Sequence, residues 1–283
     1  MSALRPMVAD DAVAVHELSV RTFADLAERF HEPPPPPPRV ARSLLRVHHL
    51  LDRDPGGAWV AEQEGEVAGA ALAIERDGLW GLSLLAVDPV HQSRGLGRAL
   101  LARALAHGDG GRRGGVILAS ADPRALRTYA RAGFVAHPCL FARGHPDGVE
   151  RPPGVRDGVD GDRGLIEQVD RAIRGVPHGE DVDAMLHAGS RLLIADRGYA
   201  LVDGGRVRLV AALDDAAAAG LLRAALAETP PGGEASVEWI TALQAWAVPP
   251  VLDAGLALRV DGAVFVRGEV GRFRPYLPSG AYL

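Results

Sequence analysis

Apolar and polar positions alternate along the chain with periods that predict a series of helices and strands. Between residues 10 and 30, apolar side chains recur at near-helical spacing and predict a helix. These side chains are Val13, Leu18, Phe23, Leu26 and Phe30. The elements expected after it are a helix near 40–51, strands at 58–62, 67–74 and 81–87, a helix at 98–106, a strand at 115–120, a helix at 123–132 and a strand at 134–141.

The second half of the chain repeats this order of elements. They are a helix near 165–173, strands at 191–195, 199–202 and 206–213, a helix at 216–227, a strand at 236–241, a helix at 243–253 and a strand at 256–266. Gly133 and Gly255 follow corresponding helices, where a left-handed cap is needed. A repeat separation of about 120 residues favours duplicated domains over a solenoid. We therefore expect an α/β (α+β) protein of two domains, each with a mixed central β-sheet flanked by helices.

The domain boundaries follow from a change in composition. Residues 147–164 are dense in Gly, Pro, Asp and Arg and lack apolar periodicity, so they are predicted to be a linker. The first domain then covers 1–146, the second covers 165–270, and 271–283 form a tail. Its prolines and glycine exclude a helix, so the aromatic tail is expected to lie extended, either as a structural strap or across the edge of a site in the first domain. The six prolines at 33–38 predict polyproline II.

The composition argues against several classes of protein. With 283 residues, 47% of them hydrophobic, the chain can supply two cores. The mean hydropathy is +0.03, and no apolar run reaches the roughly 18–20 residues that span a bilayer. Cys139 is the only cysteine, which excludes an intrachain disulfide, and no signal peptide is evident, so we expect a cytoplasmic protein.

The charge balance does not favour nucleic-acid binding. Basic residues number 31 and acidic residues 36. Lysine and asparagine are both absent, which is typical of a GC-rich genome, so the many arginines partly reflect codon usage.

A glycine-punctuated loop between the strand at 81–87 and the helix at 98–106 is the strongest chemical signal. The first N–H groups of a helix have no partner within the helix, and its dipole places partial positive charge there. Glycine allows close approach of a phosphate, and two arginines add charge. The predicted phosphate-binding residues are Gln92, Ser93, Arg94, Gly95, Leu96, Gly97 and Arg98.

Three motifs together resemble the GCN5-related N-acetyltransferases (GNAT). They are Leu85-Ala86-Val87-Asp88-Pro89, Gln92-x-x-Gly95-x-Gly97 and Tyr129-x-x-x-Gly133-Phe134. The resemblance covers residues 2–144, whereas the second half is similar in element order only. The whole chain thus resembles a tandem GNAT protein with a degenerate second copy. The resemblance implies acetyl-CoA as co-substrate and no metal.

The resemblance also assigns roles to particular residues. The loop N–H groups would hold the pyrophosphate of acetyl-CoA, and the backbone of Leu85, Ala86 and Val87 would pair with the pantetheine arm. Tyr129 would protonate the departing thiolate as the general acid. Asp122 is expected to cap the following helix.

The sequence does not single out one residue as the general base. Many relatives have a glutamate on the strand that leads into the loop, but residues 82–84 carry no carboxylate. The remaining candidates are Glu28, His31, Glu32, Glu75 and a bound water.

The second half lacks the features of an acyl-CoA site. The segment 214–220 has no glycine pair and no arginine, and its two aspartates would repel a pyrophosphate. Val251 stands where Tyr129 stands in the first half. We expect this half to form a wall of the acceptor cleft or a pseudo-dimer interface, to which Tyr199, Trp239 and Trp246 could contribute.

The predicted function is direct transfer of an acetyl group from acetyl-CoA to an amine of a small-molecule or peptide acceptor. The alternatives are a thiol or hydroxyl acceptor, and a non-catalytic acyl-CoA sensor. Neither nucleic acid nor membrane is expected as a partner, and a monomer is favoured over a homodimer.

Overall fold

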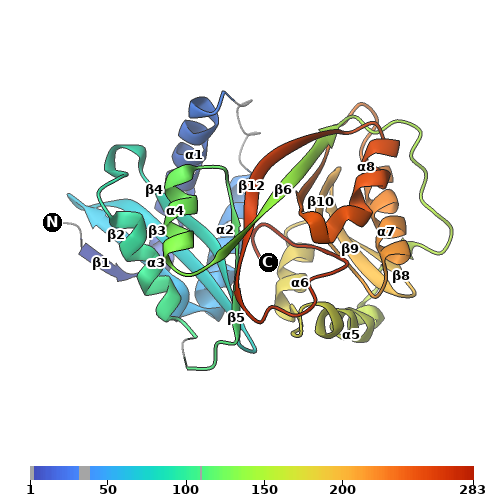
Figure 1. Cartoon of the computed structure of the whole chain (residues 1–283). Helices are drawn as coiled ribbons and strands as arrows, with labels where there is room; N and C mark the ends of the chain where they lie inside the picture. Colours follow the sequence, from blue (N-terminus) through green and yellow to red (C-terminus); the bar gives the residue numbers. More distant parts are fainter. Residues whose placement is uncertain (1–2, 32–38, 109) are drawn as a thin grey trace.

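The computed structural model describes residues 3–31, 39–108 and 110–283. The first half contains β1 (Ala3–Pro6), α1 (Ala12–Arg29), α2 (Val40–Arg53), β2 (Ala58–Gln63), β3 (Glu66–Arg76), β4 (Leu79–Val87), α3 (Leu96–Ala106), β5 (Gly114–Ala119), α4 (Pro123–Arg131) and β6 (Val135–Gly144). The second half contains β7 (Arg156–Asp157), α5 (Arg163–Ile173), α6 (Glu180–His187), β8 (Arg191–Ala195), β9 (Gly198–Asp203), β10 (Arg206–Ala212), α7 (Asp215–Ala227), β11 (Ala235–Ile240), α8 (Val248–Asp253), β12 (Ala257–Gly268) and β13 (Tyr276–Leu277). The expected mixed α/β architecture is confirmed (Figure 1).

One continuous sheet joins the two halves. Its strand order is β1-β2-β3-β4-β5-β12-β6-β11-β10-β9-β8-β7, with β13 paired to β10. β12, from the second half, lies between β5 and β6, and β6, from the first half, lies between β12 and β11 (Figure 1). Each half therefore supplies a strand to the sheet of the other, and the halves cannot separate without breaking these ladders.

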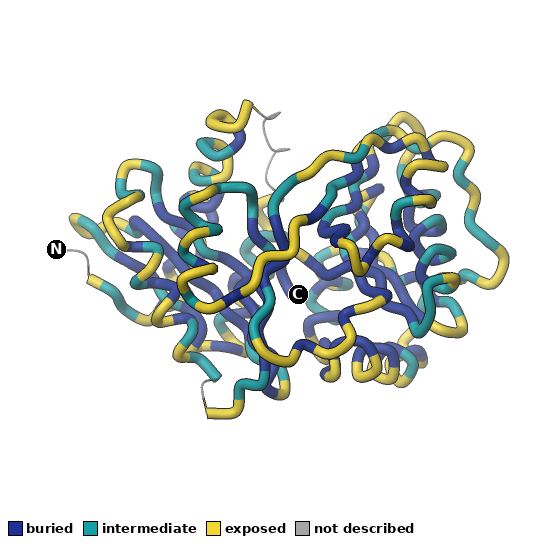
Figure 2. The backbone as a smooth tube through the Cα atoms, in the orientation of Figure 1, coloured by how far each residue is buried: buried dark blue, intermediate teal, exposed yellow. Residues whose placement is uncertain are grey.

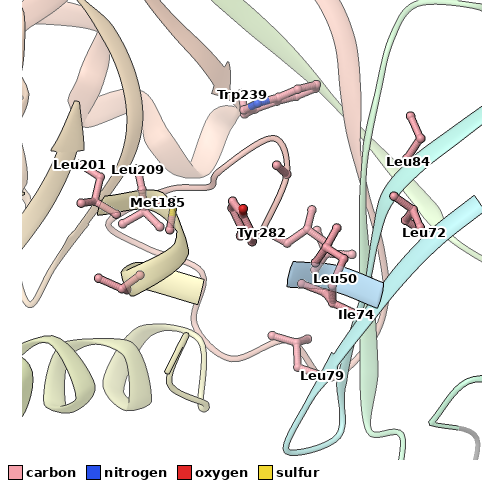
Figure 3. Packing of buried hydrophobic residues seen from close by; sticks show 14 of the residues in the cluster. Leu50, Leu72, Ile74, Leu79, Leu84, Met185, Leu201, Leu209, Trp239 and Tyr282 are labelled. Carbon is pink, nitrogen blue, oxygen red and sulfur yellow. The ribbon is translucent and has the colours of Figure 1, made fainter. Parts of the chain in front are cut away.

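The buried side chains of the described residues form three clusters, and each contains residues from both halves. One cluster packs α3 and α4 on the first half of the sheet, and another packs α7 and α8 on the second half. The third joins Leu50 of α2 with Met185 of α6 and Tyr282 of the tail (Figure 3). Figure 2 shows buried segments continuing through both halves. Because this core is shared, we expect the halves to unfold together.

The first helix buries a face that its apolar pattern did not indicate. In α1, Val13, Phe23 and the following Phe30 are 54%, 45% and 39% exposed. Residues five positions apart are rotated by about 140° around a helix, so positions 13, 18 and 23 cannot share one face. The buried face consists mainly of small and polar residues, namely Ala12, Val15, His16, Leu18, Ser19 and Ala27. The predicted helix is therefore correct, and of its predicted apolar positions Leu18 is buried whereas Val13, Phe23 and Phe30 are exposed.

Several element boundaries differ from those predicted. The segment 147–164 is not linker throughout, because it contains β7, which pairs with β8, and the first residues of α5. α6 was not predicted. The helix expected at 243–253 is divided into a 3-10 helix (Ala242–Ala247) and α8, which has proline in its first turn. The polyproline segment at 33–38 lies outside the described residues.

The C-terminal tail crosses from the second half to the first. It pairs with β10 through β13. Farther along, the ring of Tyr282 meets the ring of His49 on α2 edge-on, with centroids 5.8 Å apart. The side chain of Leu283 lies against β4, where a Cβ on Gly81 would be 1.8 Å from its Cδ1. Most of the tail is buried, so it belongs to the shared core.

Candidate functional site

The parallel strands β4 and β5 separate in the middle of the first half. Their register ends at Leu82 and Ile117, while β4 continues to Val87 alongside β3. Ser83 has no partner in β3 and forms a bulge at the point of separation. The edge of β4 beyond Ser83 is therefore not paired with β5, and its backbone groups can pair with an extended ligand. The predicted pantetheine-binding residues Leu85, Ala86 and Val87 lie on this edge.

The loop after β4 is itself the N-terminus of α3. Ser93 and Gly95 have φ angles of 63° and 85°, and Gly95 caps the helix. The first helical hydrogen bond runs from the N–H of Ala99 to the Gly95 carbonyl at 3.0 Å. The N–H groups ahead of that bond have no partner within the helix, and they belong to Leu96, Gly97 and Arg98. α3 begins two residues earlier than predicted, which brings these groups into the phosphate-binding loop.

Hydrogen bonds and one ion pair hold this loop in place. The N–H of Asp88 donates to the Ala68 carbonyl of β3 at 2.9 Å, and the Asp88 carboxylate pairs with Arg21 of α1 at 3.2 Å. The side-chain amide of Gln92 donates to the Val87 carbonyl at 2.9 Å. Gln92 therefore closes the loop onto the end of β4, which is a positioning role.

Arg94 and Arg98 supply positive charge beside the N-terminus of α3. Both side chains are exposed, and neither makes an ion pair within the described part of the chain. Gly95 leaves open space above the loop, since a Cβ placed there would meet only a guanidinium nitrogen of Arg98, at 3.8 Å. The helix dipole, the free N–H groups and the two guanidinium groups together favour a bound anion.

Tyr129 lies at the core side of α4. As predicted, Asp122 caps this helix by accepting a hydrogen bond from the N–H of Arg124 at 2.9 Å. The Tyr129 ring packs edge-on against Phe265 of β12, with centroids 5.6 Å apart. Burial, with a smaller contribution from the charge of Asp122, raises the pKa of the Tyr129 hydroxyl above its ordinary value. The phenol is therefore protonated at neutral pH.

The candidates for the general base lie in different environments. Ser83 is buried at the bulge, and its hydroxyl has no hydrogen-bond partner among the described residues. Glu75 accepts a backbone N–H in the turn between β3 and β4, at the end of the strands away from the loop. Glu28 and His31 are exposed at the end of α1, and Glu32 lies outside the described residues.

The second half has a corresponding separation of strands, but the chain itself fills it. β10 and β11 pair in parallel only at Arg206 and Ser236, and β13 pairs with β10 beyond that point. β13 thus occupies the edge of β10 that corresponds to the unpaired edge of β4 in the first half. At the start of α7, the carboxylate of Asp214 accepts the N–H of Ala217 at 2.8 Å. An acidic cap and an occupied edge both disfavour an acyl-CoA here.

The second half contains a buried polar cluster that was not predicted from the sequence. His178 bonds Asp170 through Nδ1 at 2.9 Å and the hydroxyl of Tyr276 through Nε2 at 3.1 Å. The Tyr199 hydroxyl donates to the other oxygen of Asp170 at 2.6 Å. All four residues are fully buried, so the cluster anchors the tail and offers no access to a substrate. Because these residues are scattered along the chain, no local pattern marked them.

The other residues considered for a cleft have different environments. Tyr199 and Trp246 are buried in the second half. Trp239 packs edge-on against Phe141 of β6, with centroids 4.8 Å apart, in the cluster shared by the halves. Burial raises the pKa of the Cys139 thiol to about 12, so this residue is not a thiolate at neutral pH.

The described residues contain no group of three or more His, Cys, Asp or Glu side chains that could hold a metal ion. None of the helices in these ranges combines the length and the apolar character that crossing a membrane requires.

The comparisons with known proteins agree with this geometry. Residues 20–134 match the model of the Acetyltransferase (GNAT) family, so this part of the chain is a GNAT domain. A candidate acetyltransferase from Pyrococcus horikoshii is 18% identical with a TM-score of 0.78, covering 99% of this chain and 95% of its own. No curated protein matches the chain.

Two further solved structures share the fold over nearly the whole chain. A GCN5-related N-acetyltransferase from Sphaerobacter thermophilus is 18% identical with a TM-score of 0.61, covering 95% of this chain and 96% of its own. A tandem GNAT protein from the clavulanic acid biosynthesis pathway is 16% identical with a TM-score of 0.61, covering 95% and 99%. The structural likeness over nearly the whole chain supports the tandem fold.

Proposed function

We propose that the GNAT domain of this chain binds acetyl-CoA and transfers its acetyl group directly to an amine. The observation that carries the proposal is the meeting of the open β4 edge with the N-terminus of α3. The backbone of Leu85, Ala86 and Val87 would bind the pantetheine arm as an added strand. The free N–H groups of α3, with Arg94 and Arg98, would bind the pyrophosphate.

The residues present can support each step of the transfer. A neutral amine attacks the thioester carbonyl, a C–N bond forms, the C–S bond breaks, and the sulfur takes a proton. Backbone N–H groups of β4 beyond the Ser83 bulge would stabilise the developing oxyanion. Tyr129, protonated at neutral pH, would donate to the thiolate.

We assign removal of the amine proton to a water held at the β4 bulge. The buried Ser83 hydroxyl has an unused hydrogen-bonding capacity, and residues 82–84 contain no carboxylate. A water that bonds this hydroxyl and strand carbonyls can accept the proton and pass it to solvent.

The decisive experiment compares two glycine substitutions. Gly95→Glu places a carboxylate at the N-terminus of α3, where it repels a pyrophosphate and competes for the free N–H groups. Gly65→Glu is the matched control, because Gly65 has the same φ of 85° and lies in open space in the turn between β2 and β3. Both changes carry a similar backbone cost of about 1–2 kcal/mol.

We expect calorimetry to show at least a tenfold loss of acetyl-CoA affinity for Gly95→Glu and unchanged affinity for Gly65→Glu. Unchanged affinity in both variants would overturn the assignment of the loop. Acetyl-CoA binding without thiol release, over a broad panel of amines, thiols and alcohols, would instead favour the sensor function.

A further inference from the structure

Two arginine side chains between the halves have no partner in the described part of the chain. Arg46 belongs to α2 of the first half and Arg208 to β10 of the second half. Both are half-buried, and neither makes a hydrogen bond or an ion pair with a described residue. The ion pair between Arg42 of α2 and Asp203, the last residue of β9, brings α2 against the turn that leads into β10, and the charge of Arg46 acts on Arg208.

The neighbouring arginines are paired. Arg39, which directly precedes α2, and Arg42 of α2 share the carboxylate of Asp203. Arg206 binds Glu238 through both carboxylate oxygens, each at 3.0 Å. The group therefore contains five arginines against two carboxylates, in a chain whose net charge is −5. Positive charge is concentrated at this place and is not a general property of the surface.

Keeping these two cations unpaired is costly. Burial lowers the pKa of both guanidinium groups, that of Arg208 to about 10. A half-buried charge without a counterion loses hydration, and two like charges repel each other. Arginine also presents a planar fork of N–H donors that fits carboxylate and phosphate oxygens. An anion bound between the two side chains would remove both penalties.

Arg208 lies at a β-bulge in β10. It is the bulge residue of β10, as Ser83 is of β4, and each stands four positions before the last residue of its strand. A bulge redirects a side chain out of the regular alternation of the strand. The signal in the sequence was one charged residue inside the apolar run 207–212.

The apolar cluster beside the arginine pair extends to the β4 bulge. The Tyr282 hydroxyl is influenced by the charges of Arg46 and Arg208 and, in Figure 3, points toward the side on which Trp239 lies. The Trp239 indole N–H is buried and has no hydrogen-bond partner in the described part of the chain. Trp239 belongs to the same apolar cluster as Leu84, the residue that follows the β4 bulge.

We infer that Arg46 and Arg208 bind the acceptor, and that the acceptor is an amine carrying an anionic group, either carboxylate or phosphate. This inference rests on the proposed function, because it assumes that the amine reaches the β4 bulge from this side. The unpaired indole N–H of Trp239 supplies a further donor for a polar group of the acceptor.

The first test measures binding without turnover. The probes are N-acetylglycine, N-acetylphenylalanine and phenyl phosphate, each titrated into the protein saturated with CoA. The variants are Arg46→Gln and Arg208→Gln. Arg53→Gln is the matched control, since Arg53 lies two turns from Arg46 on α2, is about half exposed and pairs with Glu180. We expect a roughly ten- to hundredfold loss of affinity in the first two variants and none in the control.

The second test measures thiol release with matched acceptors. Phenylalanine is compared with phenylalaninamide, and 2-aminoethyl phosphate with ethanolamine. We expect the anionic member of a pair to have the lower KM, and Arg46→Gln or Arg208→Gln to remove that difference without changing the KM of acetyl-CoA. A preference for carboxylate or for phosphate identifies the source of the anion.

The outcomes separate the two proposals. Anion binding that depends on Arg46 and Arg208, with no thiol release from any acceptor, would contradict the proposed transfer and preserve the anion site. Thiol release with equal KM for charged and neutral acceptors would overturn the anion site and preserve the transfer. Failure of all three probes to bind, or equal binding by wild type and both variants, would also overturn it.

Discussion

The contact of Leu283 with β4 can be tested by a double-mutant cycle. Leu283 is 3% exposed, and its Cδ1 would lie 1.8 Å from a Cβ added at Gly81. Gly81→Ala alone therefore forces Leu283 to move, at a cost typical of overpacking, about 1–3 kcal/mol. Leu283→Ala alone removes buried methyl groups and leaves a cavity, at a cost of about 2–5 kcal/mol.

The double variant is expected to be more stable than the sum of the two changes predicts. The alanine methyl at position 81 would occupy part of the space that Leu283 leaves, and the clash would disappear. Ile74 Cγ1, at 3.3 Å from the added Cβ, limits the fit but requires only a small adjustment. We expect a favourable coupling free energy of about 2 kcal/mol, within the range found for residues in contact.

The assay is equilibrium unfolding in urea, monitored by the fluorescence of the four tryptophans. An unchanged m-value would show that the same surface is exposed on unfolding in each variant. Leu252→Ala is the control, because Leu252 is 52% exposed and should change the unfolding free energy by about 0.5 kcal/mol at most. Additivity of the two single changes within about 0.5 kcal/mol would refute the placement of the tail on β4.

Three further predictions concern the site and the buried phenols. Tyr129→Phe should lower kcat for thiol release without changing the Kd of acetyl-CoA; equal kcat would leave Tyr129 with a packing role only. Arg94→Gln and Arg98→Gln should each weaken acetyl-CoA binding and reduce its salt dependence, whereas binding that stays equally sensitive to salt would argue against pyrophosphate at this loop. Burial raises the pKa of Tyr129, Tyr199 and Tyr276, so the unfolded chain loses these protons first as pH rises. These phenols should therefore contribute a constant amount to stability below about pH 10 and a falling amount above it, by up to about 1.4 kcal/mol per pH unit for each phenol, and a flat stability profile between pH 10 and pH 11 would contradict this.

Local patterns accounted for most of the first half. The loop from Gln92 to Arg98 was recognisable because strand, glycines and helix are consecutive in the sequence, and its chemistry depends on that local order. The apolar face of α1 was predicted wrongly because Phe23 and Phe30 are exposed, while small residues such as Ala12 pack against the sheet. Which side of a helix is buried depends on its neighbours as well as on its own residues.

Other features required the tertiary structure because they join segments distant in sequence. The positions of β6 and β12 in each other's sheets depend on backbone hydrogen bonds, which carry no side-chain signature. The fit of Leu283 against Gly81 and the approach of Arg46 to Arg208 arise in the same way. The tail was identifiable in the sequence as extended, but its path was not.

The sequence by itself determined the order of most of the elements and the GNAT character of residues 20–134, and it predicted that the loop from Gln92 to Arg98 binds a phosphate. Each of these depends on residues within a few positions of one another, where spacing and residue type limit the conformations available. The tertiary structure decided that the two halves share one sheet and one core, that the tail pairs with β10, and that Arg46 and Arg208 have no partner among the described residues. These features depend on contacts between residues that are distant in the sequence, and no local pattern of residue types reveals such contacts.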